Sequence, residues 1–119
     1  MREIEAPHAR HVLEAFEWHD LSVIKVSLTE RGLELVVAPY DQEADREVFR
    51  CLRIVEADAL SLDITGELSP RDMRSLEVSS FDYAIAPSGR MTGTLGLLPG
   101  SAGFWKIAFM NARWSLEDA

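Results

Sequence analysis

Cysteine is almost missing from this chain of 119 residues, in which Cys51 is the only one. A single cysteine excludes an internal disulfide and any zinc site built from several cysteines. Free cysteine is usually buried, and the residues around Cys51 are apolar, so we expect a buried thiol. These apolar neighbours are Val48, Phe49, Leu52 and Ile54.

Long apolar runs are missing as well. No window approaches the roughly 20 apolar residues that a membrane-spanning helix requires. Charged residues interrupt the start of the chain, MREIEAPHARHVLEAFEWHD, and leave no apolar segment of the kind found in secretion signals. We therefore expect a cytoplasmic protein.

Basic residues are in short supply. The chain has 12 Lys and Arg against 20 Asp and Glu, which gives a formal net charge of −8. Such a chain is repelled by the phosphates of nucleic acids and by anionic membrane surfaces, so we expect neither as a partner. A basic protein partner would be attracted.

Apolar residues make up 47% of the chain, an ordinary share for a globular protein. The length suits one domain with one core, over residues 1–119. Residues 7–17 predict a short N-terminal helix, because Pro7 fits a first helical position. The apolar stripe of this helix would consist of Val12, Leu13 and Phe16.

Alternating residues over 21–28 and 33–39 predict a β-hairpin around a turn at 29–32, where Gly32 is free to take positive φ. The apolar faces would be Ile24, Val26 and Leu28 in the first strand and Leu33, Leu35 and Val37 in the second. Residues 41–58 fit either a helical stripe or a strand buried on both faces. We favour a strand from Glu47 to Glu56, because β-branched and aromatic residues are frequent there.

The strand expected at 59–64 alternates cleanly, and a loop is expected at 65–72. Further on, the apolar pattern of residues 74–86 changes parity, and a β-bulge near Ser79–Ser80 would restore a common face. A second change of parity falls at Asn111 in the last strand. There we expect either another bulge or a strand with two buried faces. Turns are expected at 87–90 and 98–103.

About seven short strands, close turns and one short N-terminal helix predict a mostly β protein (α+β by count). The architecture expected is an antiparallel β-sandwich or a curled barrel.

No familiar catalytic motif is found. The GxSxG pattern fails around Ser101, because Pro99 occupies its first position. The glycines do not form a phosphate-binding loop. Gly93 and Gly96 more simply indicate close packing or strand curvature. We therefore assign no catalytic residue and no cofactor.

The histidines all lie near the N-terminus. On a helix, His8, His11 and Glu14 would share a face, and imidazoles with a carboxylate suit zinc or a similar ion. The competing interpretation, which we prefer, is that these are exposed residues on the polar side of the helix.

The triplet Trp18-His19-Asp20 precedes the first strand. Adjacent side chains on an extended backbone point in opposite directions, so His19 and Asp20 are not expected to form a catalytic dyad. We interpret the triplet as a structural polar joint, in which Trp18 anchors the chain in the core and the two polar residues are held by buried bonds.

Trp105 and Trp114 lie in the last strand. If the two rings point to opposite faces, one of them is exposed and becomes a candidate interface residue.

The order of these features resembles a group of small bacterial β-rich domains of poorly defined function, some of which look like immunity proteins of toxin systems. The features that match are the Trp18-His19-Asp20 triplet, the hairpin at 21–38, the strand-like VFRCLRIVEADALSLDI and the final WKIAFMNARWSL. The resemblance spans about residues 18–116. It implies no catalytic residues, and the segment before Trp18 departs from it.

Two functions follow as hypotheses. The first is a non-catalytic binding or protein-interaction domain, such as an immunity-type inhibitor of a basic partner. The alternative is a metal-dependent or small-ligand-binding protein that uses the N-terminal histidines. A homodimer formed through edge strands is a further expectation.

Overall fold

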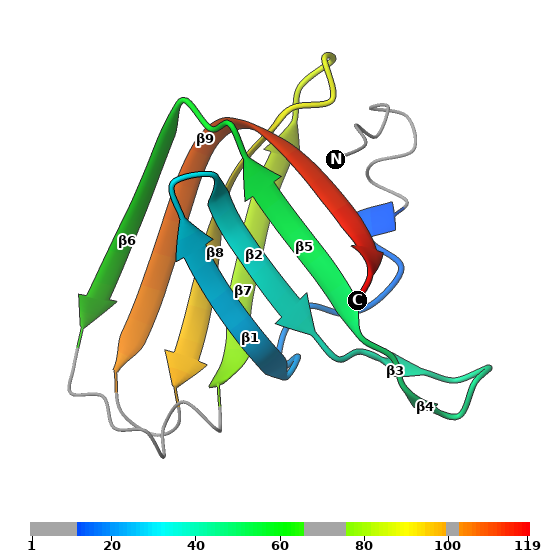
Figure 1. The fold of residues 1–119 in the computed structure, drawn as a ribbon. Coiled ribbons are helices and arrows are strands. Elements are labelled where there is room, and N and C mark those ends of the chain that lie inside the picture. The colour runs from blue at the N-terminus through cyan, green and yellow to red at the C-terminus, as the bar shows by residue number, and fades with distance from the viewer. Residues whose placement is uncertain (1–11, 66–75, 100–102) are drawn as a thin grey trace.

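The computed structural model describes residues 12–65, 76–99 and 103–119. This part of the chain is mostly β and forms a curled antiparallel sheet, as the sequence predicts (Figure 1). No helix in these ranges is long and apolar enough to cross a membrane. The strands are β1 (Val23–Thr29), β2 (Gly32–Val37), β3 (Tyr40–Asp41), β4 (Arg46–Glu47), β5 (Arg50–Val55), β6 (Ala59–Thr65), β7 (Leu76–Ile85), β8 (Met91–Pro99) and β9 (Phe104–Asp118).

The main sheet has the strand order β1-β2-β5-β9-β8-β7, and β6 pairs with β9 beside this path. The sheet curls into a half-barrel around one core (Figure 1). A separate small hairpin, β3–β4, projects away from it.

The predicted hairpin is confirmed as β1 and β2, which pair up to Thr29 and Gly32 across a two-residue turn. Gly32 has φ 136°, and an added Cβ would lie 2.0 Å from the Ile54 carbonyl oxygen. The turn thus needs glycine both for its backbone conformation and for the close approach of β5. The predicted inner face of β2 is buried throughout: Leu33, Leu35 and Val37.

The expected face of β1 is wrong at Ile24. The register shifts between Val23 and Lys25, so Ile24 is the extra residue of a bulge and is exposed. Val23 occupies the core position instead and is buried. Leu28, also expected on this face, is exposed, and of the three predicted residues only Val26 packs against the core.

The ambiguous segment is confirmed as a strand, but a shorter one than predicted. Its regular part is β5, and the β3–β4 hairpin occupies the residues before it. Within β5, Cys51, Leu52 and Ile54 are buried, so burial on both faces is confirmed there. Phe49, expected to be part of this strand, lies outside it and is exposed.

The bulge predicted in β7 is confirmed, and of the two alternatives at Asn111 the structure has the bulge. In β7 the register shifts between Val78 and Ser80. In β9, Met91 pairs with Ala112 while Gly93 pairs with Phe109, so three steps along β9 match two along β8. Asn111 lies in this interval with φ 50°. Just before it Met110 is exposed, whereas Ala112, Trp114 and Leu116 after it are buried in the core.

A second bend lies beside the β9 bulge, in the connection from β5 to β6. Glu56, between β5 and β6, also has positive φ (51°), so the chain bends there while it follows β9. The Asn111 side-chain amide donates to the Asp58 carboxylate at 2.9 Å, and the Asp58 N–H donates to the Met110 carbonyl. Arg90 donates to the Asn111 carbonyl at 3.0 Å. These bonds satisfy polar groups that the bulge removes from the ladder.

The ends of the curled sheet meet beside the first strand. The Asp20 N–H donates to the Val78 carbonyl, and the Val78 N–H donates to the Leu21 carbonyl, both at 2.8 Å. Ser22 and Glu77 form an isolated bridge at the same place. The chain just before β1 therefore joins the start of β7.

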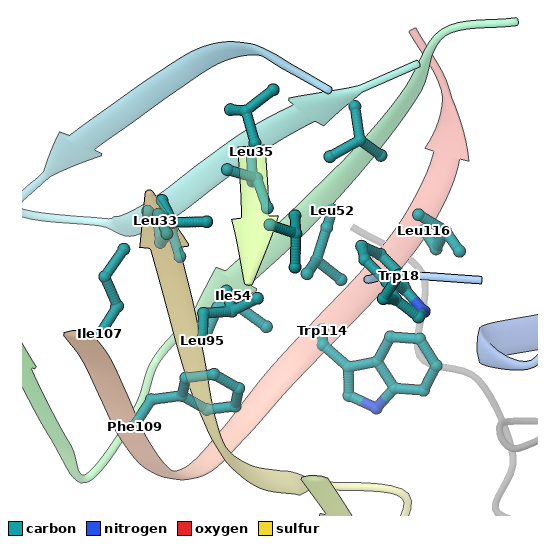
Figure 2. Close-up of a cluster of buried hydrophobic side chains, with 14 of the residues drawn as sticks. Trp18, Leu33, Leu35, Leu52, Ile54, Leu95, Ile107, Phe109, Trp114 and Leu116 are labelled. Carbon is teal, nitrogen blue, oxygen red and sulfur yellow. The ribbon is translucent and has the colours of Figure 1, made fainter. Parts of the chain in front are cut away.

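The core fills the inside of the curl. Figure 2 shows side chains from both halves of the sheet pointing toward one another, with Trp114 and Phe109 among the largest that are fully buried. The Trp114 indole N–H donates to the Gly89 carbonyl at 2.9 Å, so this large ring is buried without an unpaired donor.

The predicted helix at 7–17 is only partly within the described residues. Val12 and Leu13 are helical, a turn follows, and no helix element is assigned in the described part. The stripe of Val12, Leu13 and Phe16 does pack on the core, and Leu13 is fully buried. The loop expected at 65–72 lies almost entirely, and the turn at 98–103 partly, outside the described residues.

Gly32→Ala is expected to destabilise the fold by about 3 kcal/mol or more, because the new Cβ meets backbone in a conformation that L residues rarely adopt. Urea unfolding followed by tryptophan fluorescence measures this loss. Gly96→Ala is the control: its Cβ meets the side chains of Ser80 and Phe104, which can shift, so about 1 kcal/mol is expected. Equal losses in the two variants would contradict the backbone argument.

Asp20 has φ 66°, a conformation that glycine adopts without strain, and its side chain is exposed. Alanine tolerates positive φ less well than aspartate, so Asp20→Ala should lower the free energy of unfolding by about 1 kcal/mol. Asp20→Gly should be as stable as the parent chain or slightly more so. Chemical unfolding of the two variants side by side gives the comparison. If both lose the same stability, the carboxylate and not the backbone is what matters.

Candidate functional site

A hollow lined by exposed polar side chains lies at the base of the β3–β4 hairpin. This groove has a volume of about 530 Å³ between the chain before Trp18 and the hairpin. We call it the acidic groove. Its described lining residues are Ala15, Phe16, Glu17, Pro39, Tyr40, Asp41, Gln42, Glu43, Val48 and Arg50.

Local bonds hold the hairpin that forms one wall of the groove. The Asp41 carboxylate accepts from the backbone N–H groups of Glu43 (2.9 Å) and Ala44 (3.3 Å), which fixes the tight turn. Asp45 closes the turn with φ 52°. At its base, the Val48 N–H donates to the Pro39 carbonyl at 2.9 Å.

Tyr40 stands at the edge of the groove with an exposed side chain. Its hydroxyl donates a hydrogen bond to the Asp45 carboxylate, and this bond raises the pKa of Tyr40 above its ordinary value. The phenol thus stays neutral and its ring is tied to the hairpin. An exposed tyrosine ring beside carboxylates offers a face to a cationic side chain.

Negative charge dominates the groove. Glu17, Asp41 and Glu43 line it, and Arg50 is the one basic residue among the described lining residues. Arg50 is already paired with Asp118 at 3.3 Å. The groove therefore has surplus negative charge, and a cation entering it meets the exposed residues Glu17 and Glu43.

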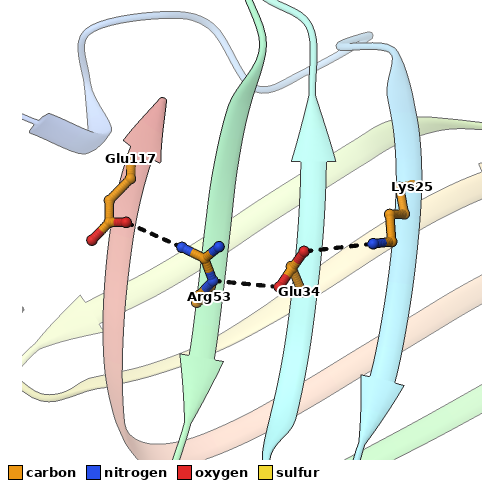
Figure 3. A network of polar contacts seen from close by, with 4 residues as sticks. All are labelled: Lys25, Glu34, Arg53 and Glu117. Atoms are coloured by element: carbon orange, nitrogen blue, oxygen red, sulfur yellow. Dashed lines mark hydrogen bonds and ion pairs between the residues drawn. The ribbon is translucent and has the colours of Figure 1, made fainter. Parts of the chain in front are cut away.

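A second polar cluster lies on the outer face of the sheet. Unlike the acidic groove, it has no surplus charge. Figure 3 shows Lys25, Glu34, Arg53 and Glu117 in a row across β1, β2, β5 and β9. The contacts are 3.8 Å from Lys25 to Glu34, 3.3 Å from Arg53 to Glu34 and 3.1 Å from Arg53 to Glu117. Charges in this row neutralise one another, so the row links strands and does not attract a charged partner.

Cys51 is buried, as predicted from its neighbours. Burial raises the pKa of its thiol, and the nearby Arg53 opposes this shift only in part. The reactive thiolate form is accordingly disfavoured.

The structure confirms one residue of the Trp18-His19-Asp20 triplet as predicted. Trp18 is buried, its indole N–H donates to the Leu13 carbonyl at 2.8 Å, and its ring lies 4.8 Å from Phe16 and 4.9 Å from Phe81 between centroids. It is an anchor for the N-terminal segment.

The expectation for the other two residues is wrong. The His19 Nδ1 lies 3.1 Å from the Asp20 carboxylate, and the side chains are 64% and 69% exposed. The two side chains meet because the chain turns here and Asp20 adopts positive φ, whereas the prediction assumed an extended backbone. Backbone groups of Asp20 and Leu21, and not buried polar side chains, make the joint.

The condition for an exposed tryptophan in the last strand, two rings on opposite faces, is not met. Trp114 is buried and Trp105 is partly buried against the same core. The bulge at Asn111 is the reason, because it returns both rings to the inner face.

The metal candidates remain a prediction. His8 and His11 lie outside the described residues, and Glu14 is exposed. Within the described ranges, no group of three His, Cys, Asp or Glu side chains is placed to hold a metal ion.

Sequence reasoning missed the acidic groove. The signal was present in the carboxylates at every second position over 41–47, which are Asp41, Glu43, Asp45 and Glu47. They look like an ordinary solvated surface until the hairpin gathers them beside Tyr40.

Comparison of this chain with protein-family models, with curated proteins and with solved structures gave no match. The geometry and charge of its surface are therefore the basis on which a function can be proposed.

Proposed function

We propose that this chain is a non-catalytic interaction domain that binds a basic protein partner, as an immunity-type inhibitor does. The observation that carries the proposal is the acidic groove, in which a projecting hairpin presents carboxylates and an exposed aromatic ring to solvent. The net charge of −8 supports the same choice of partner.

The groove favours a cationic segment of a protein over a small anion or a nucleic acid. Glu17, Asp41 and Glu43 attract lysine and arginine side chains, and the Tyr40 ring can stack on a guanidinium group. Apolar groups of Phe16, Pro39 and Val48 supply contact surface between these charges. A basic surface of the kind that a nuclease-type toxin uses to hold nucleic acid has the complementary chemistry.

The hairpin is suited to present this surface. It is tied down at its base and within its turn, so its groups lose little freedom on binding. It also projects from the half-barrel, where a partner can approach without meeting the main sheet (Figure 1).

The proposal is tested by native pull-down from lysate of the source cells with two charge-reversed baits. Glu17→Lys/Glu43→Lys should retain a basic partner at least about tenfold less than the parent chain, because both changes lie in the groove. The matched control is Glu30→Lys/Asp82→Lys, which changes exposed residues outside the groove and gives the same net charge, −8 + 4 = −4. Equal retention by the two baits would contradict the assignment of the groove.

A salt titration of the captured complex is the second readout. Raising NaCl from about 0.05 M to about 0.5 M shortens the Debye length several-fold and should release the partner. A complex that is insensitive to salt would rule out recognition by charge.

A further inference from the structure

Strand β6 is an edge strand. It pairs with β9 over its whole length, from Ala59–Met110 to Thr65–Phe104, and with no other strand of the described part of the chain. One row of its backbone N–H and C=O groups is therefore open to pairing with an added strand.

β6 lacks the features that usually protect such an edge. β1, at the end of the main sheet, carries a bulge at Ile24 and the charged Lys25, both of which hinder pairing with another chain. β6 pairs without a register shift and contains neither lysine nor proline. Its one charged residue, Asp63, lies directly opposite Lys106 of β9.

The ribbon formed by β6 and the first half of β9 also exposes large hydrophobic side chains of the described residues, on both of its faces. It carries four of the eight large hydrophobic side chains that are exposed there: Leu62 (42%) and Ile64 (42%) on one face, and Phe104 (36%) and Met110 (57%) on the opposite face. Asp63 and Lys106 cancel, so the ribbon is neutral in a chain whose net charge is −8.

We propose that β6 is a homodimer interface, where β6 of a second copy adds antiparallel to it around a two-fold axis at Leu62. This register sets Leu62 against its own copy, Leu60 against Ile64, and Ser61 against Asp63. No like charges stand directly opposite each other, and the apolar side chains form one stripe.

The charge distribution identifies a second copy as the occupant. Two chains of −8 repel each other over most of their surface and approach best where the surface is neutral and apolar. A basic protein gains no attraction at β6, since Lys106 already balances Asp63. The dimer is independent of the proposed use of the acidic groove.

Multi-angle light scattering over a range of concentrations tests the dimer. The parent chain should reach twice the 13.3 kDa of one chain. Ser61→Asp should weaken the dimer about 2- to 30-fold, because two pairs of carboxylates then face each other across the axis. Ser61 is exposed and stands opposite Ala108 within one chain, so the monomer fold, checked by circular dichroism, should be unchanged.

Ser61→Lys is the matched variant, since it sets lysine against Asp63 of the second copy. It should dimerise at least as tightly as the parent chain. A parent chain that stays monomeric at all concentrations would overturn the proposal. So would a dimer that neither variant affects, which would place the interface elsewhere, or one that both variants weaken equally, which would exclude the register around Leu62.

Discussion

The bend of β9 at Asn111 is the constraint on which the rest of the fold depends. β9 is 15 residues long and is the common neighbour of β5, β6 and β8. A straight strand of that length would put alternate apolar residues on opposite faces of a flat sheet. The extra residue at the bulge restores the inner face and lets the sheet close around one core. Hydrogen bonds from Arg90 and to Asp58 satisfy the groups that the bulge leaves out of the ladder.

The two surfaces proposed for binding are consequences of this arrangement. β5 and β6 follow β9 around the bend, whereas β2 accompanies only β5, from Gly32 opposite Val55 onward. β6 therefore continues beyond the end of the β1–β2 hairpin, and one of its two edges has no partner among the described strands. The connection from β2 to β5 contributes the projecting β3–β4 hairpin and, with it, the acidic groove. One surface is neutral and apolar and the other is acidic, so the two favour different partners.

The sequence predicted much of the fold and little of the candidate site. The bulges near Ser79 and at Asn111 were visible because a regular strand cannot keep one buried face when its apolar pattern changes parity. The role of His19 and Asp20 was mistaken because the prediction assumed extended backbone, and positive φ in a non-glycine residue leaves no reliable mark in a single sequence. The groove was missed because Glu17 and Glu43 are far apart in sequence and meet only in the folded chain.

By itself, then, the sequence determined the strand pattern, the inner face of β2, the glycine turn at Gly32 and the acidity of the chain, since each depends on local periodicity, conformational preference or composition. Only the tertiary structure decided which strands are neighbours, that the segment before β1 meets β7 through Leu21 and Val78, and that β6 has an unpaired edge among the described strands. These features depend on contacts between residues distant in sequence. Such contacts are selected by how well the whole set of side chains fills one core, and not by any short stretch of the chain.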